Sequence, residues 1–160
     1  MGTGYLQREV TASLLDRLCD LDPELQHDVH QTTDGRIREF RSALCRDLGA
    51  LLNTRRASED FDRSYEESAN SLLTFGIIDF TSYNLKNGTD QEQLRRSMER
   101  AIRKFEPRLE RVAVSIDEAE PQRTVLRLQI SAVLKTNAEP VVFDATVHRD
   151  SRRVAVSGRA

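Results

Sequence analysis

The 160-residue sequence contains no tryptophan, three tyrosines, six phenylalanines and two cysteines. Cys19 and Cys45 are too far apart to match a metal-binding pattern. No apolar stretch is long enough to span a bilayer, so we expect no direct membrane insertion. Near the N-terminus, Arg8 and Glu9 interrupt what would have to be the apolar core of a signal peptide. We therefore expect a cytoplasmic protein in which both thiols are reduced.

An excess of positive charge is also lacking. The chain has 24 Lys and Arg against 26 Asp and Glu, a formal net charge of −2. Binding to nucleic acid generally needs a basic excess, so we expect no nucleic-acid partner. Apolar residues make up 38% and charged residues 31% of the chain, enough for a modest core under an ionic surface. We expect a single domain over residues 1–160, with residues 1–10 flexible.

Motifs of catalysis and cofactor binding are absent as well. There is no Gly-x-Ser-x-Gly elbow and no glycine-rich phosphate loop. The two cysteines fall in or beside apolar helix stripes, where buried thiols are common. His27 and His30 could share a metal on a helix, but no third ligand follows at a fixed spacing, so we interpret them as loop histidines. We interpret His148 as a surface residue, and we predict no catalytic residue, no metal and no cofactor.

Three segments have the apolar periodicity of amphipathic helices: residues 13–18, 36–52 and 89–105. In the second, Asp34 is a suitable N-cap and Asn53 a suitable end. Residues 71–76 read as a short apolar turn that ends at a glycine.

The third of these helices has the strongest signals. Asn87-Gly88 interrupts the chain before it, and Thr89 with Glu92 has the spacing of a capping box. Its surface carries the i,i+4 pairs Glu92–Arg96 and Glu99–Arg103. Pro107 disfavours helix in the residue before it, so the helix should end near Phe105.

After Pro107 the apolar period changes from 3.6 to 2, which is typical of strands. The alternating segments are residues 111–116, 126–135, 141–148 and 153–156. Short turns between them favour antiparallel pairing, and one apolar face per strand requires a cover on one side. We therefore predict an α+β fold, in which amphipathic helices pack on one face of a three- to four-stranded, mainly antiparallel sheet.

Two charged motifs flank the predicted helices. Arg55 and Arg56 follow a helix end, where positive charge is favourable; they could also form a fork that binds carboxylates of a partner. Glu106-Pro107-Arg108 lies at the joint between the last helix and the first strand. Physical chemistry alone favours the plainer reading of both, helix-end charges in the first motif and a helix stop with two solvated charges in the second.

Four blocks of sequence, taken together and in order, resemble the TssE family of type VI secretion baseplate subunits. They are residues 13–18 (Ser-Leu-Leu-Asp-Arg-Leu), 46–56 (Arg-Asp-Leu through Leu-Asn-Thr-Arg-Arg), 71–77 (Ser-Leu-Leu-Thr-Phe-Gly-Ile) and 105–109 (Phe-Glu-Pro-Arg-Leu). That family is similar to a wedge protein of contractile phage baseplates, which is sometimes labelled lysozyme-like. The chain departs from the family at Ile78, where proline is usual, and at Gly49, where an acidic residue is common.

The resemblance implies a structural subunit and not an enzyme. It implies wedge partners TssF, TssG and TssK, and a platform from which the TssB–TssC sheath polymerises. The family's Glu-Pro-Arg motif, which contacts the wedge core, corresponds to Glu106, Pro107 and Arg108, and this overrides the plainer reading of those residues. We expect Glu106 and Arg108 to be at least partly exposed, and a strand edge within residues 141–156 to receive the first sheath subunit.

Two other functions stay open at this point. The lysozyme-like label suggests a peptidoglycan hydrolase, which needs a carboxyl group of raised pKa and a second carboxylate in a sugar-sized cleft. The scarcity of aromatic residues argues against it. A regulatory adaptor that binds one protein could be built on the same fold.

Overall fold

The computed structural model describes residues 18, 33–56, 67, 71–117, 125–148 and 150–159. The predicted helix at residues 13–18 lies outside this range except for Leu18, as do Cys19, His27 and His30. The helical elements are α2 (Thr33–Asn53), the 3-10 helix η1 (Leu72–Thr74) and α4 (Gly88–Phe105). The strands are β1 (Leu109–Asp117), β2 (Val125–Leu134), β3 (Pro140–His148) and β4 (Val154–Gly158).

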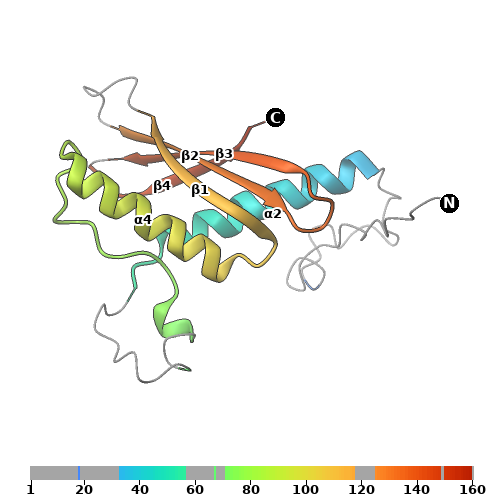
Figure 1. The fold of residues 1–160 in the computed structure, drawn as a ribbon, viewed down its shortest axis with the longest axis horizontal. Helices are drawn as coiled ribbons and strands as arrows, with labels where there is room; N and C mark the ends of the chain where they lie inside the picture. Colours follow the sequence, from blue (N-terminus) through green and yellow to red (C-terminus); the bar gives the residue numbers. More distant parts are fainter. Residues whose placement is uncertain are drawn as a thin grey trace.

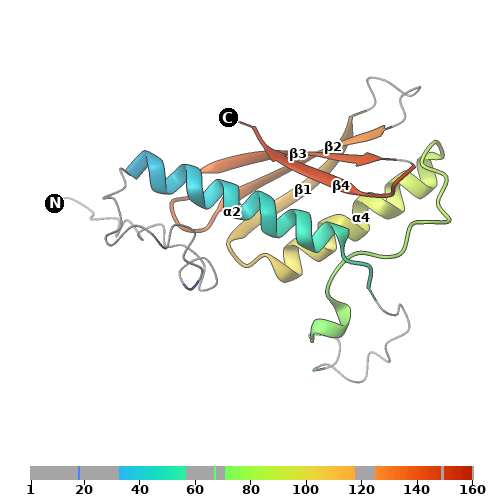
Figure 2. The ribbon, with the colours of Figure 1, turned by 180° about the vertical axis from the view of Figure 1, so that it is seen from behind.

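The four strands form one sheet in the order β1-β2-β3-β4, and every neighbouring pair is antiparallel (Figure 1). Helices α2 and α4 cover one face of this sheet, as the view from behind also shows (Figure 2). Inward side chains are buried at alternate positions of each strand, while most outward ones are partly exposed or exposed. The predicted α+β fold is confirmed, and the sheet has four strands.

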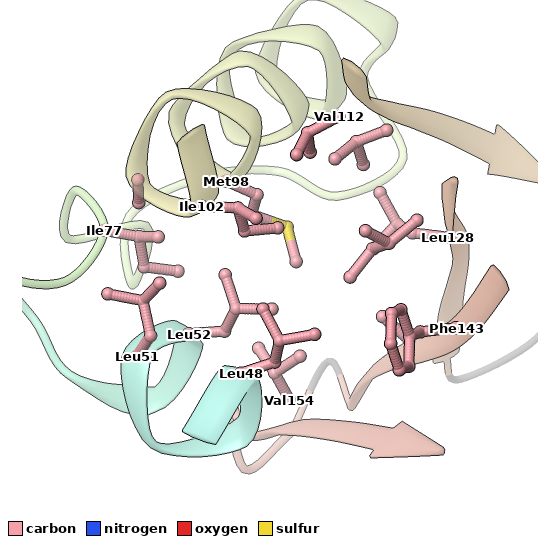
Figure 3. Close-up of a cluster of buried hydrophobic side chains, with 14 of the residues drawn as sticks. Leu48, Leu51, Leu52, Ile77, Met98, Ile102, Val112, Leu128, Phe143 and Val154 are labelled. Carbon is pink, nitrogen blue, oxygen red and sulfur yellow. The ribbon is translucent and has the colours of Figure 1, made fainter. Parts of the chain in front are cut away.

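The core lies between the two helices and the sheet. Leu48 and Leu52 of α2 and Met98 and Ile102 of α4 point toward strand residues such as Phe143 (Figure 3). Each of these side chains is almost fully removed from water, which stabilises the fold by roughly 1.5–3 kcal/mol per large apolar side chain. Residues from all four strands meet both helices in this one cluster.

The helix boundaries correct two details of the sequence interpretation. Helix α2 begins at Thr33, so Asp34 is its second residue and not its N-cap; it ends at Asn53, as predicted. Helix α4 is capped by Asn87, whose side chain accepts a hydrogen bond from the Thr89 N–H, so the Thr89–Glu92 capping box is wrong. The asparagine side chain reaches the second helical N–H first, which leaves Glu92 to pair with arginines instead.

Two places in the chain have a positive backbone φ that shapes the fold, one in β1 and one after η1. A β-bulge in β1 between Glu110 and Ala113, with Arg111 at a φ of 51°, shifts the register so that Leu109 and Val112 both face the core. Gly76 has a φ of 100°, and a Cβ there would lie 2.3 Å from the Thr54 backbone oxygen. Only glycine fits this close crossing between the end of α2 and the segment after η1.

Candidate partner-binding surfaces

Glu106 lies at the turn between α4 and β1 and is buried, with 4% of its surface exposed. Its carboxylate accepts two hydrogen bonds from the Arg108 guanidinium, from Nε at 2.6 Å and from Nη2 at 2.5 Å. It also accepts a bond from the Arg108 backbone N–H at 3.2 Å. Because Pro107 separates the two residues, the chain turns so that acid and base face each other. The expectation that Glu106 is exposed is therefore wrong.

Arg108 is held from a second side by helix α2. Its Nη2 donates to the Asp47 carboxylate at 2.7 Å, and its guanidinium lies 5.7 Å from the centre of the Phe40 ring. The hydrogen bonds that Arg108 donates to Glu106 are the main cause that raises the pKa of Arg108, and the bond that it donates to Asp47 adds to it. Its side chain keeps 23% exposure, so the expected partial exposure of Arg108 is confirmed. The corner formed by Asp47, Glu106, Pro107 and Arg108 is called the charged corner below.

One part of the charged corner is left without a partner. The Nη1 atom of Arg108 is buried and donates to no group among the described residues. A buried donor that makes no hydrogen bond costs roughly 1–3 kcal/mol, so this atom lowers the stability that the corner contributes to the fold. Pro107 beside it is exposed. Arg108 and Pro107 are thus the members of the motif that a neighbouring protein can reach.

The arginine pair at the end of α2 serves the fold. Arg55 Nη1 donates to the Leu52 carbonyl at 3.2 Å, which is the favourable helix-end charge that the sequence suggested. Its Nη2 donates to the Arg152 carbonyl at 2.7 Å, and its guanidinium stacks 4.1 Å from the centre of the Phe80 ring. The Arg56 backbone N–H donates to the Ile77 carbonyl. The contacts of Arg55 with Leu52, Arg152 and Phe80 include no member of the charged corner.

The outer edge of β1 is closed in its middle by side chains of α4. The carbonyl of Val112 accepts from Arg103, and that of Val114 accepts from Arg95 at 3.0 Å. The N–H of Val114 donates to the Glu99 carboxylate at 3.3 Å. Glu99 in turn forms ion pairs of 2.7 Å with both arginines. The outward groups of Ile116, next to the strand end, have no such partner among the described residues.

On the outer edge of β4, side chains of α2 form hydrogen bonds with backbone groups of Val154 and Gly158, and Val156 lies between them. The His148 N–H donates to the Arg153 carbonyl, and the Arg159 N–H donates to the Val142 carbonyl, so Arg153 and Arg159 face β3. Because backbone groups of successive strand residues point to opposite sides, those of Val154, Val156 and Gly158 point away from β3. The side-chain amide of Asn53 bonds both backbone groups of Val154, at 2.8 and 2.9 Å.

Further along the same edge, the Gly158 N–H bonds the Cys45 sulfur. The pKa of the Cys45 thiol is raised by burial and only partly lowered by this bond. Among the described residues, no group bonds the outward N–H and C=O of Val156 or the C=O of Gly158. The free groups of β4 therefore lie at Val156, in the middle of the edge, and at the Gly158 carbonyl, at its end.

Catalytic geometry does not emerge from the described part of the chain. A hollow of about 540 Å³ lies on the uncovered face of the sheet, and its acids include Asp144, which pairs with Arg159 at 2.9 Å. The pKa values of Asp79 and Glu92 are lowered by hydrogen bonds, opposite to what a general acid requires. Within the described residues, no three His, Cys, Asp or Glu side chains gather to hold a metal ion. None of the described helices has the length and apolar character to cross a membrane. His148 is exposed, as expected.

Sequence patterns missed three of the residues that shape these surfaces. Asp47 contacts Arg108 across 61 positions of the chain, and Asn53 contacts Val154 across 101. The i,i+4 spacing predicts only the helical pair of Glu99 with Arg103, although Glu99 also accepts a hydrogen bond from β1. Charged and amide residues on a helix surface are too common for periodicity alone to single these three out.

A family model described as baseplate wedge protein gp25 matches residues 38–139, more than half of the chain. The match begins inside α2, includes η1, α4, β1 and β2, and ends just before β3. It therefore contains the whole charged corner. The search of curated proteins found no match to this chain.

Proposed function

The chain belongs to the baseplate wedge protein gp25 family, and from this premise we propose that it is the TssE-type structural subunit of a type VI secretion baseplate. The family match is the observation that carries the baseplate role. The four sequence blocks that resemble TssE support the assignment to type VI secretion. In this role the protein docks on TssF, TssG and TssK and starts polymerisation of the TssB–TssC sheath, without acting as an enzyme.

The charged corner is the proposed contact with the wedge. Arg108 is the group that touches the partner, because 23% of its side chain is exposed whereas Glu106 is buried. Glu106 and Asp47 are positioning residues, since they fix the guanidinium through three hydrogen bonds. A planar guanidinium held this way presents its remaining donors in one direction, which suits a carboxylate or a backbone carbonyl on the partner. Pro107 keeps the turn rigid.

Arg55 and Arg56 take a lesser part in this proposal. Arg55 is occupied by the Leu52 and Arg152 carbonyls and by the Phe80 ring. We assign it to the fold, where it joins the end of α2 to the turn before β4. Only a partner that displaced these contacts could use its guanidinium.

The proposed sheath contact is the open centre of the β4 edge. An extended segment of a sheath subunit can add there as a fifth strand, with hydrogen bonds to Val156 and to the Gly158 carbonyl. The hydrogen bonds along the two edges favour β4 over β1 for this role. The middle of β1 is already closed by Glu99, Arg95 and Arg103, whereas the central outward groups of β4 have no partner in the described residues.

Arg108→Lys tests the wedge contact with little disturbance of the fold. The lysine keeps a positive charge beside Glu106 but loses the fork and Nη1. We expect affinity for a purified TssF–TssG complex, measured by biolayer interferometry, to fall by roughly 30-fold or more, as at an interface hot spot. Arg41→Lys is the matched control, because Arg41 forms a comparable half-buried pair with Glu139 outside the corner. Equal affinity of the two variants per folded molecule would restrict Arg108 to a structural role. Failure of the wild type to bind would overturn the wedge assignment.

A further inference from the structure

The short helix η1 exposes two leucines in an ordered turn. Leu72 is 83% exposed and Leu73 is 53% exposed, although large apolar side chains of this protein are otherwise mostly buried. In both views of the ribbon, η1 projects away from the sheet and helices (Figures 1 and 2). Two adjacent leucines held in water are more than the scattered single apolar residues that every surface carries.

The turn that carries these leucines is fixed by its own hydrogen bonds. Ser71 caps it, because its hydroxyl accepts from the Leu73 N–H at 3.2 Å. Thr74 Oγ1 donates to the Ser71 carbonyl at 3.0 Å, and the Phe75 N–H donates to the Leu72 carbonyl at 3.0 Å. Side chains on such a turn lose little further freedom when they bind, which favours an interface anchor.

Helix α4 holds the turn from the other side. Lys104 Nζ donates to Thr74 Oγ1 at 2.8 Å, and the Phe75 ring packs edge-on against Phe105 with their centres 5.2 Å apart. Phe105 directly precedes Glu106, so the two leucines and the charged corner are attached to the same end of α4. A partner that docks on the corner has the leucine turn as the adjoining surface.

On the side of helix α4, the surroundings of the turn are basic. Lys104 lies against Thr74, and Arg100 is one helical turn before it. The guanidinium of Arg100 is exposed, donates to the Arg96 carbonyl and has no carboxylate partner among the described residues. An apolar pair with positive charge beside it is complementary to an apolar pocket with negative charge at its rim.

We propose that Leu72 and Leu73 form an apolar anchor that inserts into an acid-rimmed apolar pocket of a neighbouring baseplate protein. The choice of a baseplate protein as partner rests on the proposed function. The anchor is a second contact beside the charged corner, and the two would bind one continuous surface. A lipid surface suits the pair less well, because two leucines without a lipid chain or a larger apolar face anchor a protein only weakly.

Leu72→Ser tests the anchor, and Leu18→Ser is its matched control, since Leu18 is 81% exposed. With the full-length protein and a purified TssF–TssG complex as the probe, we expect Leu72→Ser to weaken binding roughly 10-fold and Leu72→Ser with Leu73→Ser roughly 30-fold or more. Leu18→Ser should change affinity less than about 2-fold. Lys104→Glu should weaken binding and reduce its dependence on salt. All four variants should keep the melting temperature of the wild type.

Other outcomes overturn the proposal in distinguishable ways. If the wild type binds and both Leu72 variants bind equally well, the leucines are no anchor. If Leu72→Ser lowers the melting temperature and Leu18→Ser does not, another part of the same chain covers the pair. If sedimentation equilibrium detects a dimer that Leu72→Ser dissociates, the occupant is a second copy. If no variant and no wild type binds TssF–TssG, the proposed function fails and the partner named here fails with it.

Discussion

The two edge strands of the sheet, β1 and β4, differ in how many of their outward backbone groups are hydrogen-bonded by side chains of the helices. At β1, helix α4 supplies a carboxylate and two guanidinium groups, and these close the central positions Val112 and Val114. At β4, helix α2 supplies the Asn53 amide, which bonds Val154, and the Cys45 sulfur, which accepts from the Gly158 N–H. Val156 between them stays unbonded among the described residues. Unpaired strand edges invite another strand, and proteins usually block them. The open centre of β4 is therefore the position in this sheet that best fits strand addition.

The side-chain bonding seen along the β1 edge continues into the turn between α4 and β1. There Glu106 is buried with Arg108, so acid and base satisfy each other inside the chain. Near β4, by contrast, the Asp144–Arg159 pair is exposed to solvent on both partners. The comparison predicts that mutations cost most folding stability in the α4–β1 half.

The largest effect is expected from Glu106→Ala. It leaves the partly buried Arg108 without its main partner, and the loss of one member of a buried pair costs on the order of 3–5 kcal/mol. Asp144→Ala, which breaks the exposed pair, should cost less than about 1 kcal/mol. Urea unfolding of the two variants measures the difference. Equal stability of both would mean that the Glu106–Arg108 pair contributes no more than a surface ion pair.

Glu99→Ala should have the next largest effect. The change removes the acceptor of the Val114 N–H and the partner of both Arg95 and Arg103, so we expect a loss of roughly 1–3 kcal/mol. Hydrogen exchange at the Val114 amide should also become faster, because its bond to α4 is gone. Arg100→Ala is a control on the same helix, since among the described residues Arg100 bonds a helix carbonyl and no group of β1. Unchanged exchange at Val114 would contradict the closed β1 edge.

Asn53→Ala should cost less, roughly 0.5–2 kcal/mol, because it removes one amide that bonds Val154 twice and the Gly49 carbonyl once. The amide of Val154 should then exchange faster, while that of Val114 keeps its wild-type rate. Asn137→Ala is the control, since that amide bonds Glu139 on an exposed turn. If Val154 exchange does not change, Asn53 is not what closes the start of β4.

The smallest effect concerns pH and the surface of α4. Hydrogen bonds from Arg95 and Arg96 lower the pKa of Glu92 from 4.5 to about 2. A lowered folded-state pKa stabilises the fold above the unfolded value, and the contribution is lost as the pH falls from about 4.5 through about 2. Wild type and Glu92→Gln should thus differ in melting temperature at about pH 6 and converge near pH 2. A difference that is the same at both pH values would exclude this linkage.

The arrangement of helices and strands could be predicted from local pattern. Pro107 ends α4 near Phe105, and the change of period after it gives β1 to β4, because these features depend on neighbouring residues. The first residue of a helix is harder to predict from sequence. Asn87 and Thr89 are both able to cap α4, and the backbone path decides between them. The exposure of Glu106 could not be predicted, because it depends on how the turn brings Arg108 and the distant Asp47 together.

The open edge of β4 depends on contacts that no periodicity reports. The alternation of residues 153–156 predicts a strand. It does not predict which backbone groups remain unpaired once Asn53 and Cys45 have bonded Val154 and Gly158.

Val156→Pro tests the central claim, strand addition at the β4 edge, most directly. Proline removes the outward N–H of Val156 and no bond to β3, since that N–H faces away from the sheet. Val156→Ala is the control for loss of the valine side chain, because it removes two methyl groups and keeps the N–H.

The measurement is the number of fluorescent TssB–TssC sheaths per cell in a strain whose own subunit is replaced by each variant. Immunoblots and melting temperatures of the purified variants verify equal folding. We expect Val156→Pro to abolish sheaths and Val156→Ala to form them at nearly the wild-type frequency. Sheaths at the wild-type frequency with folded Val156→Pro would contradict strand addition at the β4 edge.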